Sequence, residues 1–286
     1  MDSRSAAGAT GEEERPAFAA ASGIVRVRGG RAAVASEAVA SELPVAIAYG
    51  AETHVVMMAT PTDLEDLAIG FSLAEGIVAS VDEISDLLVA DLDVGMRVAM
   101  TIPPDRVDAL VGRERNLPGR SGCGLCGISS IEAALRTLPA APPGTTVTAA
   151  AILAAVAALP GRQDANRATG AVHAAAMADR DGRLLLVRED VGRHNALDKL
   201  VGAAARAGLR PDAGFLVLTS RCSMELVQKA ATAGFAMIVA ISAPTMLAIE
   251  LARQSGLTLA GFARPDGFNL YAHPDRVMLA GDEDQR

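Results

Sequence analysis

Short apolar segments alternate with helical patterns through the second half of the chain, and this alternation restricts the fold more than any other feature. The apolar runs have the length and composition of buried strands, and the segments between them carry apolar residues on one helical face. The expected strands are Ala171–Met177, Leu184–Val187, Phe215–Thr219, Ala236–Ile241 and Leu257–Phe262, and the expected helices are His194–Arg206, Met224–Ala233 and Thr245–Gln254. This order predicts a three-layer α/β/α domain over residues 128–275.

The first half of the chain has hairpin patterns around one amphipathic helix. The expected hairpins pair Val45–Tyr49 with His54–Met58 and Ile84–Ala90 with Gly95–Ile102. The helix is expected to begin after Thr62, because Thr62 and Glu65 have the spacing of a capping box. Together with a first strand at Ile24–Val27, these elements predict a small α+β domain over residues 23–111.

Three remaining segments show neither pattern. Residues 1–22 are small and polar, and we expect a disordered tail there. Residues 112–127 are rich in arginine and glycine and have almost no apolar anchor, so they predict a flexible loop between the domains. Residues 276–286 are expected to form a C-terminal tail.

The loop at 112–127 carries two of the chain's three cysteines, Cys123 and Cys126, in the run C-G-L-C-G. We favour thiol chemistry for this pair over a metal site or a purely structural pair. A closed zinc site needs four Cys or His ligands, and the sequence has neither a second C-x-x-C nor a closely spaced pair of histidines. A thioredoxin-like motif would follow a strand and open a helix directly, whereas this pair lies in a linker.

The charge and composition argue against several classes of partner. The net charge is -8 and there is no lysine-rich run, so nucleic acid and anionic membrane surfaces are not expected as main partners. No apolar run reaches the ~18 residues of a membrane span, and the N-terminus lacks the apolar core of a signal peptide. We therefore expect a cytoplasmic protein, whose cysteines are thiols by default.

Lysine is rare in this chain. Of 26 basic residues, only Lys199 and Lys229 are lysines, a bias typical of a GC-rich genome. A lysine that persists against this bias is a candidate for a position that needs a compact ammonium group, although an ordinary lysine on a helix surface explains it equally well.

Polar clusters follow three of the predicted strands at the points where helices begin. They are Glu189–Asn195, Thr219–Ser223 and Ser242–Thr245. Ligands of α/β sheets collect at such junctions, and helix N-termini there bind anions. For each cluster alone, capping and surface ion pairing is the simpler explanation. Three clusters at corresponding ends, with Arg193, Arg221 and Arg264, favour a phosphate-bearing ligand. For Cys222 we expect the role of a small buried apolar residue.

These segments together resemble the FdhD family, the formate dehydrogenase accessory sulfurtransferases. The matching motifs are C-G-L-C-G at 123–127, T-G-A-V-H at 169–173, E-D-V-G-R-H-N-A-L-D-K at 189–199, and the segments 220–229 and 242–245. The resemblance extends from about residue 24 to Tyr271 and includes P-T-D-L at 61–64. The motif at 189–199 combined with C-G-x-C-G is highly specific, whereas C-x-x-C alone is weak.

The resemblance implies a sulfur carrier that takes persulfide sulfur from a cysteine desulfurase. It would deliver the sulfur to the bis(molybdopterin guanine dinucleotide) molybdenum cofactor before that cofactor enters formate dehydrogenase. Cys123 would hold the persulfide and Cys126 would assist transfer. The family's cofactor-binding stretch maps onto Phe262, Ala263, Arg264, Pro265, Asp266 and Gly267, and the helix-start residues Arg193, His194, Arg221 and Ser223 complete the expected site. The cofactor is the bound substrate, GDP is its expected surrogate, and a homodimer is implied.

The resemblance also implies a cytidine deaminase-like fold for the second domain, without zinc. The deaminase signature H-x-E with P-C-x-x-C is missing, since the corresponding helix starts are H-N-A at 194–196 and R-C-S-M at 221–224. A dithiol oxidoreductase and a noncatalytic cofactor-binding chaperone are further alternatives. The oxidoreductase would cycle a disulfide, and the chaperone would bind nucleotide even after loss of both loop thiols.

Overall fold

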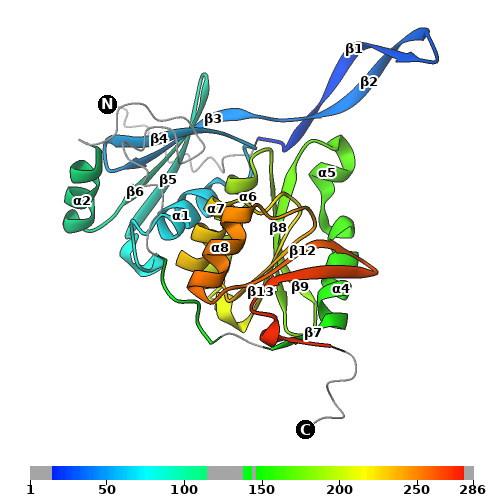
Figure 1. Ribbon diagram of the computed structural model, residues 1–286. Helices are drawn as coiled ribbons and strands as arrows, with labels where there is room; N and C mark the ends of the chain where they lie inside the picture. The colour runs from blue at the N-terminus through cyan, green and yellow to red at the C-terminus, as the bar shows by residue number, and fades with distance from the viewer. Residues whose placement is uncertain (1–14, 115–137, 144–145, 280–286) are drawn as a thin grey trace, which may run out of the picture.

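The computed structural model describes residues 15–114, 138–143 and 146–279, which form two domains and a projecting arm (Figure 1). Cys123 and Cys126 lie outside the described residues, as does most of the loop predicted at 112–127; helix α2 (Pro104–Glu114) takes up its first three positions. In the part of the chain that is described, no helix has both the length and the apolar character needed to cross a bilayer.

The N-terminal domain is a four-stranded sheet with helix α1 (Leu64–Ala74) packed on one face. In the order β4-β3-β6-β5, its strands are β3 (Leu43–Tyr49), β4 (Glu52–Ala59), β5 (Asp86–Leu92) and β6 (Gly95–Thr101). Both predicted hairpins form, and β3 and β6 join them in parallel. Val45, Ile47 and Val98 are fully buried in one core with α1, and this one-sided burial sets the register of the strands.

Helix α1 begins without the predicted capping box. Its N-cap is Asp63, whose φ of 52° is left-handed, and no side chain caps the first turn. The acids at this end face the second domain instead. Asp63 Oδ1 lies 3.2 Å from Arg188 Nε, and Glu65 Oε2 lies 2.7 Å from Arg206 Nη2. The acidic side chains therefore pair with distant arginines and not with the backbone N–H groups of the first turn.

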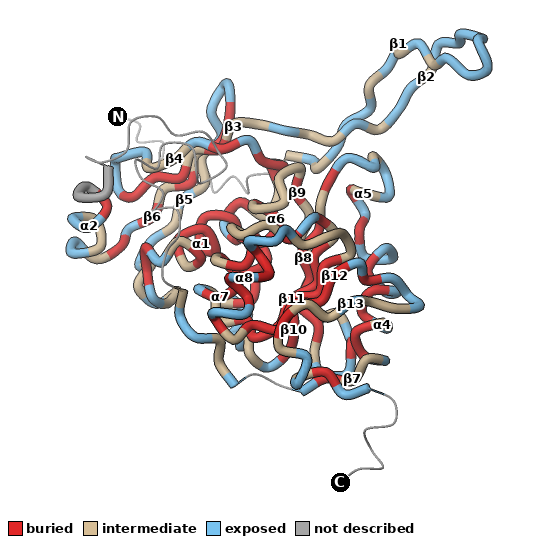
Figure 2. The backbone as a smooth tube through the Cα atoms, viewed as in Figure 1, coloured by how far each residue is buried: buried red, intermediate tan, exposed pale blue. Residues whose placement is uncertain are grey.

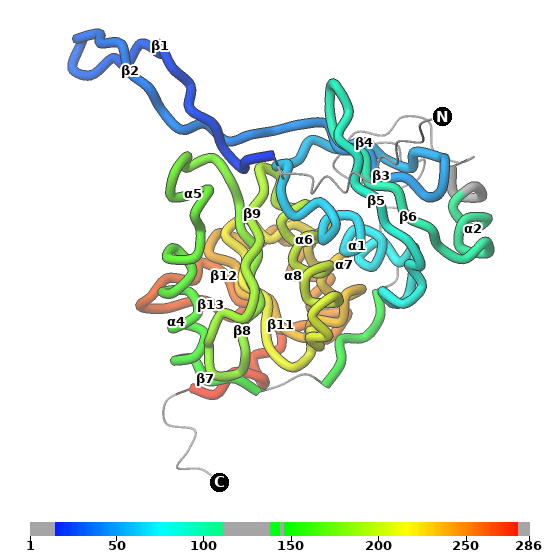
Figure 3. Tube along the Cα trace, turned by 180° about the vertical axis from the view of Figure 1, so that it is seen from behind, coloured from blue at the N-terminus to red at the C-terminus, as the bar shows by residue number. Residues whose placement is uncertain are grey.

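Strands β1 (Phe18–Arg28) and β2 (Arg31–Ala40) form an antiparallel ribbon, the arm, that projects from the body (Figures 1 and 3). The arm corrects the predicted tail at 1–22, because β1 already begins at Phe18. The predicted first strand at Ile24–Val27 lies inside β1, but it pairs with β2 in the arm and not with the N-terminal sheet. The rest of the arm was not predicted, because its many alanines have low strand propensity. On one face of the arm, Val25, Val27 and Val34 are 65%, 64% and 79% exposed.

The C-terminal domain is a six-stranded sheet between two layers of helices, as the sequence predicted. In the order β13-β12-β11-β10-β8-β9, its strands are β8 (His173–Asp179), β9 (Leu184–Asp190), β10 (Gly214–Leu218), β11 (Met237–Ala240), β12 (Thr258–Arg264) and β13 (Gly267–Ala272). Strands β10, β11 and β12 are parallel, and β8 runs against β10. The likeness to cytidine deaminases stays a prediction.

Helices cover both faces of this sheet and bury a core on each (Figure 2). Helices α6 (Arg193–Arg206), α7 (Met224–Thr232) and α8 (Met246–Ser255) cover one face, and α4 (Ala149–Ala158) covers the other. Further elements include the short helix α5 (Asp164–Thr169) and the strand pair β7 (Val147–Thr148) and β14 (Val277–Met278). The C-terminal tail predicted from residue 276 therefore begins with a strand.

The two domains meet where α1 packs against α6 at very short range (Figure 1). A Cβ atom on Gly70 would lie 1.7 Å from the carbonyl oxygen of Asp198, and one on Gly202 would lie 2.0 Å from that of Asp66. No side chain fits at either position, so glycine is required for the two backbones to approach this closely.

Candidate functional site

The three polar clusters meet at one edge of the six-stranded sheet, where β9, β10, β11 and β12 have their carboxyl ends. Backbone hydrogen bonds hold the connecting loops side by side. Cys222 N donates to Ala243 O at 3.1 Å, and Phe262 N donates to Ser242 O at 3.1 Å. Helices α6, α7 and α8 all begin at this edge, so the backbone N–H groups of three helix N-termini lie along it.

Basic side chains gather at the α6 end of this edge. His173 is partly buried, and burial, together with the charges of Arg193 and Arg221, lowers its pKa. His173 is therefore neutral near pH 7, and the positive charge of this group comes from the two arginines. Among the described residues, Arg193 Nε is buried without a hydrogen-bond partner. This group of fixed positive charges suits an anionic ligand.

His194 and Ser223, two further predicted site residues, share an acidic partner at this edge. His194 Nε2 lies 3.4 Å from Glu225 Oε2 without making a hydrogen bond, and the Ser223 hydroxyl donates to the same carboxylate oxygen. Contact with His194 is the main reason that the pKa of Glu225 falls to about 2. Sequence reasoning missed Glu225, although its position in the first turn of α7 was a signal, since acids favour helix N-termini.

The predicted cofactor stretch Phe262–Gly267 forms the turn between β12 and β13 at the same edge. Arg264 Nη1 donates to the carbonyl oxygen of Ala263 at 2.8 Å and to that of Ile241, so the guanidinium ties the end of β12 to the chain that follows β11. Ala263 is fully buried, and only its backbone is available to a ligand.

Phe262 is the most unusual residue of this turn. Its φ of 51° is rare outside glycine, and its side chain is 48% exposed. Strained backbone and exposed aromatic rings both cluster at binding sites. Pro265 and Asp266 are exposed beside it. The turn therefore presents an aromatic face and a carboxylate at the same edge of the sheet as the basic cluster.

Three members of the motif at 189–199 lie buried between the domains, and two of them, Asp190 and Asn195, belong to the cluster that was expected at the ligand edge. Lys199 and Asp190 form a fully buried ion pair of 2.7 Å. Lys199 Nζ also donates to Thr60 O at 2.9 Å, and Thr60 N donates to Asp190 Oδ2 at 3.0 Å. Asn195 Nδ2 donates to Met58 O at 2.8 Å and to Asp190 Oδ1 at 3.0 Å.

Lys229, the other lysine, is also buried between the domains. Its Nζ lies 2.9 Å from both carboxylate oxygens of Asp198, 2.9 Å from Glu75 Oε1 and 5.1 Å from the centre of the Phe71 ring. Burial raises the pKa of Asp198 to about 6 against the opposing effect of Lys229. Both lysines thus occupy sites that need a compact cation with three donors, the role that their rarity suggested.

Cys222, the third cysteine, is not expected to react. Cys222 is fully buried, and burial raises the pKa of its thiol to about 12. A thiol with so high a pKa forms almost no thiolate near neutrality and is unreactive. The expectation of a small buried apolar residue is confirmed.

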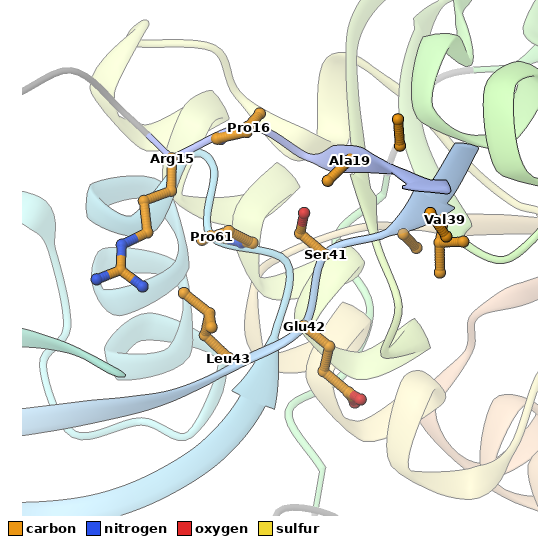
Figure 4. Close-up of a pocket in the computed structure, with 11 residues that line it drawn as sticks. Arg15, Pro16, Ala19, Val39, Ser41, Glu42, Leu43 and Pro61 are labelled. Atoms are coloured by element: carbon orange, nitrogen blue, oxygen red, sulfur yellow. The ribbon is translucent and has the colours of Figure 1, made fainter. Parts of the chain in front are cut away.

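A pocket of about 400 Å³ lies at the base of the arm rather than at the sheet edge (Figure 4). Its lining consists mainly of small apolar residues from the two ends of the arm, with Arg15, Glu42, Leu43 and Pro61, and includes none of the predicted site residues. Within the described ranges, no group of three His, Cys, Asp or Glu side chains is placed to hold a metal ion.

Known proteins resemble this chain over most of its length. Residues 40–278 match the FdhD/NarQ family. The sulfur carrier protein FdhD of Xanthomonas euvesicatoria pv. vesicatoria is 52% identical over 256 residues, which span 90% of this chain and 91% of that protein. The protein of the same name from Bordetella petrii is 45% identical over 258 residues, 90% of this chain and 93% of its own.

The fold is also similar to a solved structure. The crystal structure of a protein assigned as a formate dehydrogenase accessory protein, from Desulfotalea psychrophila, superposes with a TM-score of 0.72 at 25% sequence identity. The match covers 92% of this chain and 100% of that chain.

Proposed function

The chain belongs to the FdhD/NarQ family, and on that basis we propose that it carries persulfide sulfur from a cysteine desulfurase to the molybdenum cofactor of formate dehydrogenase. Its relatives are named sulfur carrier proteins, and its structural neighbour is assigned as a formate dehydrogenase accessory protein. The observation that carries the proposal is the family match together with the thiol pair in C-G-L-C-G at 123–127.

In the proposed reaction, the Cys123 thiolate attacks the outer sulfur of the donor's persulfide. The donor's S–S bond breaks, the donor cysteine leaves as a thiolate, and Cys123 holds the sulfur as a persulfide. Release of that sulfur as sulfide consumes two electrons. Cys126 supplies them by attacking the inner sulfur and forming a disulfide with Cys123, which a cellular dithiol then reduces.

We propose that the sheet edge binds the cofactor substrate through its guanine nucleotide part. Arg193 and Arg221 provide fixed charge for phosphate, and the helix N-termini beside them provide N–H donors. Phe262 offers an exposed ring for the base, and Asp266 lies in the same turn to accept from a guanine N–H edge. GDP is the matching surrogate.

Mass spectrometry after incubation with a desulfurase and cysteine tests the thiol step. We expect a gain of one sulfur atom on Cys123. Cys123→Ala should abolish it, whereas Cys222→Ala, the buried control, should retain it. Reduction of insulin by the Cys123–Cys126 dithiol, in a protein that gains no sulfur from the desulfurase, would favour the dithiol oxidoreductase. Formate dehydrogenase activation by a variant without either loop thiol would favour the chaperone.

Calorimetric titration with GDP and ADP tests the nucleotide site. GDP should bind more tightly, because a site that pairs with the guanine edge leaves polar groups unpaired when adenine enters. Arg221→Ala should weaken GDP binding by about tenfold, roughly the 1.5 kcal/mol of a charged hydrogen bond. Equal affinities, or no heat with either nucleotide, would remove this site and leave the thiol step standing.

We also propose that the protein is a homodimer in which the arm of each copy lies on the other copy. The valine face of the arm is exposed, and an isolated two-stranded ribbon is marginally stable in water. A matching surface is the outer face of the N-terminal sheet, where Val56, Met58 and Leu88 are exposed. These three share one face by their register across β3 and β6.

Charge and size support the second copy as occupant. The arm carries Arg26, Arg28 and Arg31 against one acid, Glu37, while the chain as a whole has a net charge of -8. A ribbon of this length is about 36 Å long, and two symmetric contacts would bury on the order of 1,400 Å², the size of a stable interface.

Sedimentation of single variants tests the dimer. Val34→Glu should yield monomers, whereas Ala33→Glu, on the opposite face of the same strand, should remain dimeric. A wild-type protein that sediments as a monomer at micromolar concentration would rule out the proposed assembly.

A further inference from the structure

The contacts between the motif at 189–199 and the N-terminal domain converge on one short turn, Asp190–Gly192, directly before helix α6. Besides the bonds given above, Gly192 N donates to Asp190 Oδ1 at 2.7 Å, and Val191 N donates to Thr60 Oγ1 at 3.1 Å. Gly192 also makes room for the network, since a Cβ there would lie 2.8 Å from Asn195 Nδ2. Every residue of the turn is therefore fixed by a hydrogen bond or by close packing.

Thr60 is the N-terminal domain's main contribution to this turn. It is 1% exposed and uses its N–H, its carbonyl oxygen and its hydroxyl to bind Asp190, Lys199 and Val191 respectively. A single residue of the first domain thus holds the turn at two points, Asp190 and Val191, and holds Lys199 of helix α6 at a third.

The turn sets the directions of two predicted site residues, Arg193 and His194. Arg193 and His194 are the first two residues of α6 and follow Gly192 directly. Successive residues of a helix point about 100° apart, so a small rotation of the first turn would carry both side chains away from the sheet edge. The directions of Arg193 and His194 are therefore decided by what holds residues 190–192.

We propose that Thr60, Asp190, Asn195 and Lys199 are positioning residues that aim Arg193 and His194 at the sheet edge. The N-terminal domain would thereby shape the anion site without touching the ligand. Buried ion pairs add little net stability but define a single geometry, which is what such a role requires. This inference rests on the proposed nucleotide binding and deepens it.

Replacing the Thr60 hydroxyl tests the proposal. Thr60→Val keeps the shape of the side chain and leaves Val191 N without its acceptor, so the dissociation constant for GDP should rise about fivefold. Thr60→Ser restores the hydroxyl and should restore affinity. Ser72→Ala is the matched control, because Ser72 is a fully buried hydroxyl that bonds Tyr49 and Ala68 and does not contact the turn. It should lower the unfolding midpoint without changing affinity.

Amide hydrogen exchange at residues 190–194, measured without ligand, supplies a second readout. Faster exchange there in Thr60→Val but not in Ser72→Ala, with the loss of affinity, supports the proposal. Equal affinity and equal exchange in wild type and Thr60→Val would overturn it. If wild-type protein binds no GDP, faster exchange would uphold the positioning of the turn and reject only the nucleotide site. Unchanged exchange would then reject both.

Discussion

Two buried lysine–aspartate pairs each have one member on helix α6, Lys199 in one pair and Asp198 in the other. They differ in the other groups that the lysine and the aspartate contact. We call the Lys199–Asp190 pair closed, because it is fully buried and each Asp190 oxygen contacts two donors. Lys199 and the N–H of Thr60 contact Oδ2, and the N–H of Gly192 and the amide of Asn195 contact Oδ1. The Lys229–Asp198 pair is open, since the ammonium is shared with Glu75, whose side chain is partly exposed.

The comparison shows how surroundings decide the role of one ion pair. The closed pair joins the turn before α6 to the first domain, so a change there moves the candidate site. The open pair lies along the middle of α6 and α7, and its aspartate has a pKa of about 6, close enough to neutrality to titrate. We expect the first pair to set geometry and the second to make stability depend on pH.

Removing the closed pair's cation should have the largest effect. Lys199→Met leaves the Asp190 carboxylate buried without a counter-charge, and we expect a loss of about 3–5 kcal/mol in the free energy of unfolding. Urea unfolding monitored by circular dichroism measures this loss. A loss below about 1 kcal/mol would show that water reaches Asp190 and that the pair is not closed.

Removing the open pair's cation should cost less. After Lys229→Met, Asp198 can take up a proton and Glu75 can turn toward solvent, so we expect a loss of about 2–3 kcal/mol at pH 7. The same unfolding measurement applies, with Lys199→Met as the comparison. A cost equal to that of Lys199→Met would contradict the distinction between the pairs.

The effect of pH on the free energy of unfolding, through Asp198 of the open pair, should be smaller than the effect of either lysine substitution. The pKa of Asp198 is raised from 3.8 to about 6, so its contribution to stability is greatest below about pH 4, declines as the pH rises to about 6, and is constant above. Lys229 has a raised pKa and stays charged throughout. Between pH 4 and pH 7 the decline should be on the order of 2 kcal/mol. Asp198→Asn should remove it from unfolding curves at pH 4 and 7, and an unchanged slope would refute the assignment.

Turn residues and apolar periodicity in the sequence predicted the hairpins of the first domain and the layers of the second. The turn at Gly50-Ala51 and the apolar alternation around it gave the β3–β4 hairpin, and the strand and helix order gave the three layers of the second domain. The polar clusters were also placed together, because parallel strands end at the same edge. The role of Cys222 followed from its residue type.

Other features depend on partners that are far away in the sequence. The acids at the start of α1 looked like parts of a cap, but their partners are Arg188 and Arg206 of the other domain. The cluster Glu189–Asn195 was predicted at the ligand edge, but its Asp190 bonds Thr60, 130 residues earlier. Only the rarity of lysine hinted at these buried positions, and the sequence could not name the carboxylates that pair with them.

The glycine contact between α1 and α6 has a consequence for synthesis of the protein. The ribosome releases Gly70 long before Gly202, and the bond between Thr60 and Asp190 likewise spans 130 residues. At a synthesis rate of about 5–20 residues per second, helix α1 is exposed for roughly ten seconds before helix α6 is synthesised and can pack against it. During that interval we expect the exposed surface of α1 to be a binding site for chaperones that hold nascent chains. We also expect it to be the surface through which neighbouring nascent chains would associate wrongly.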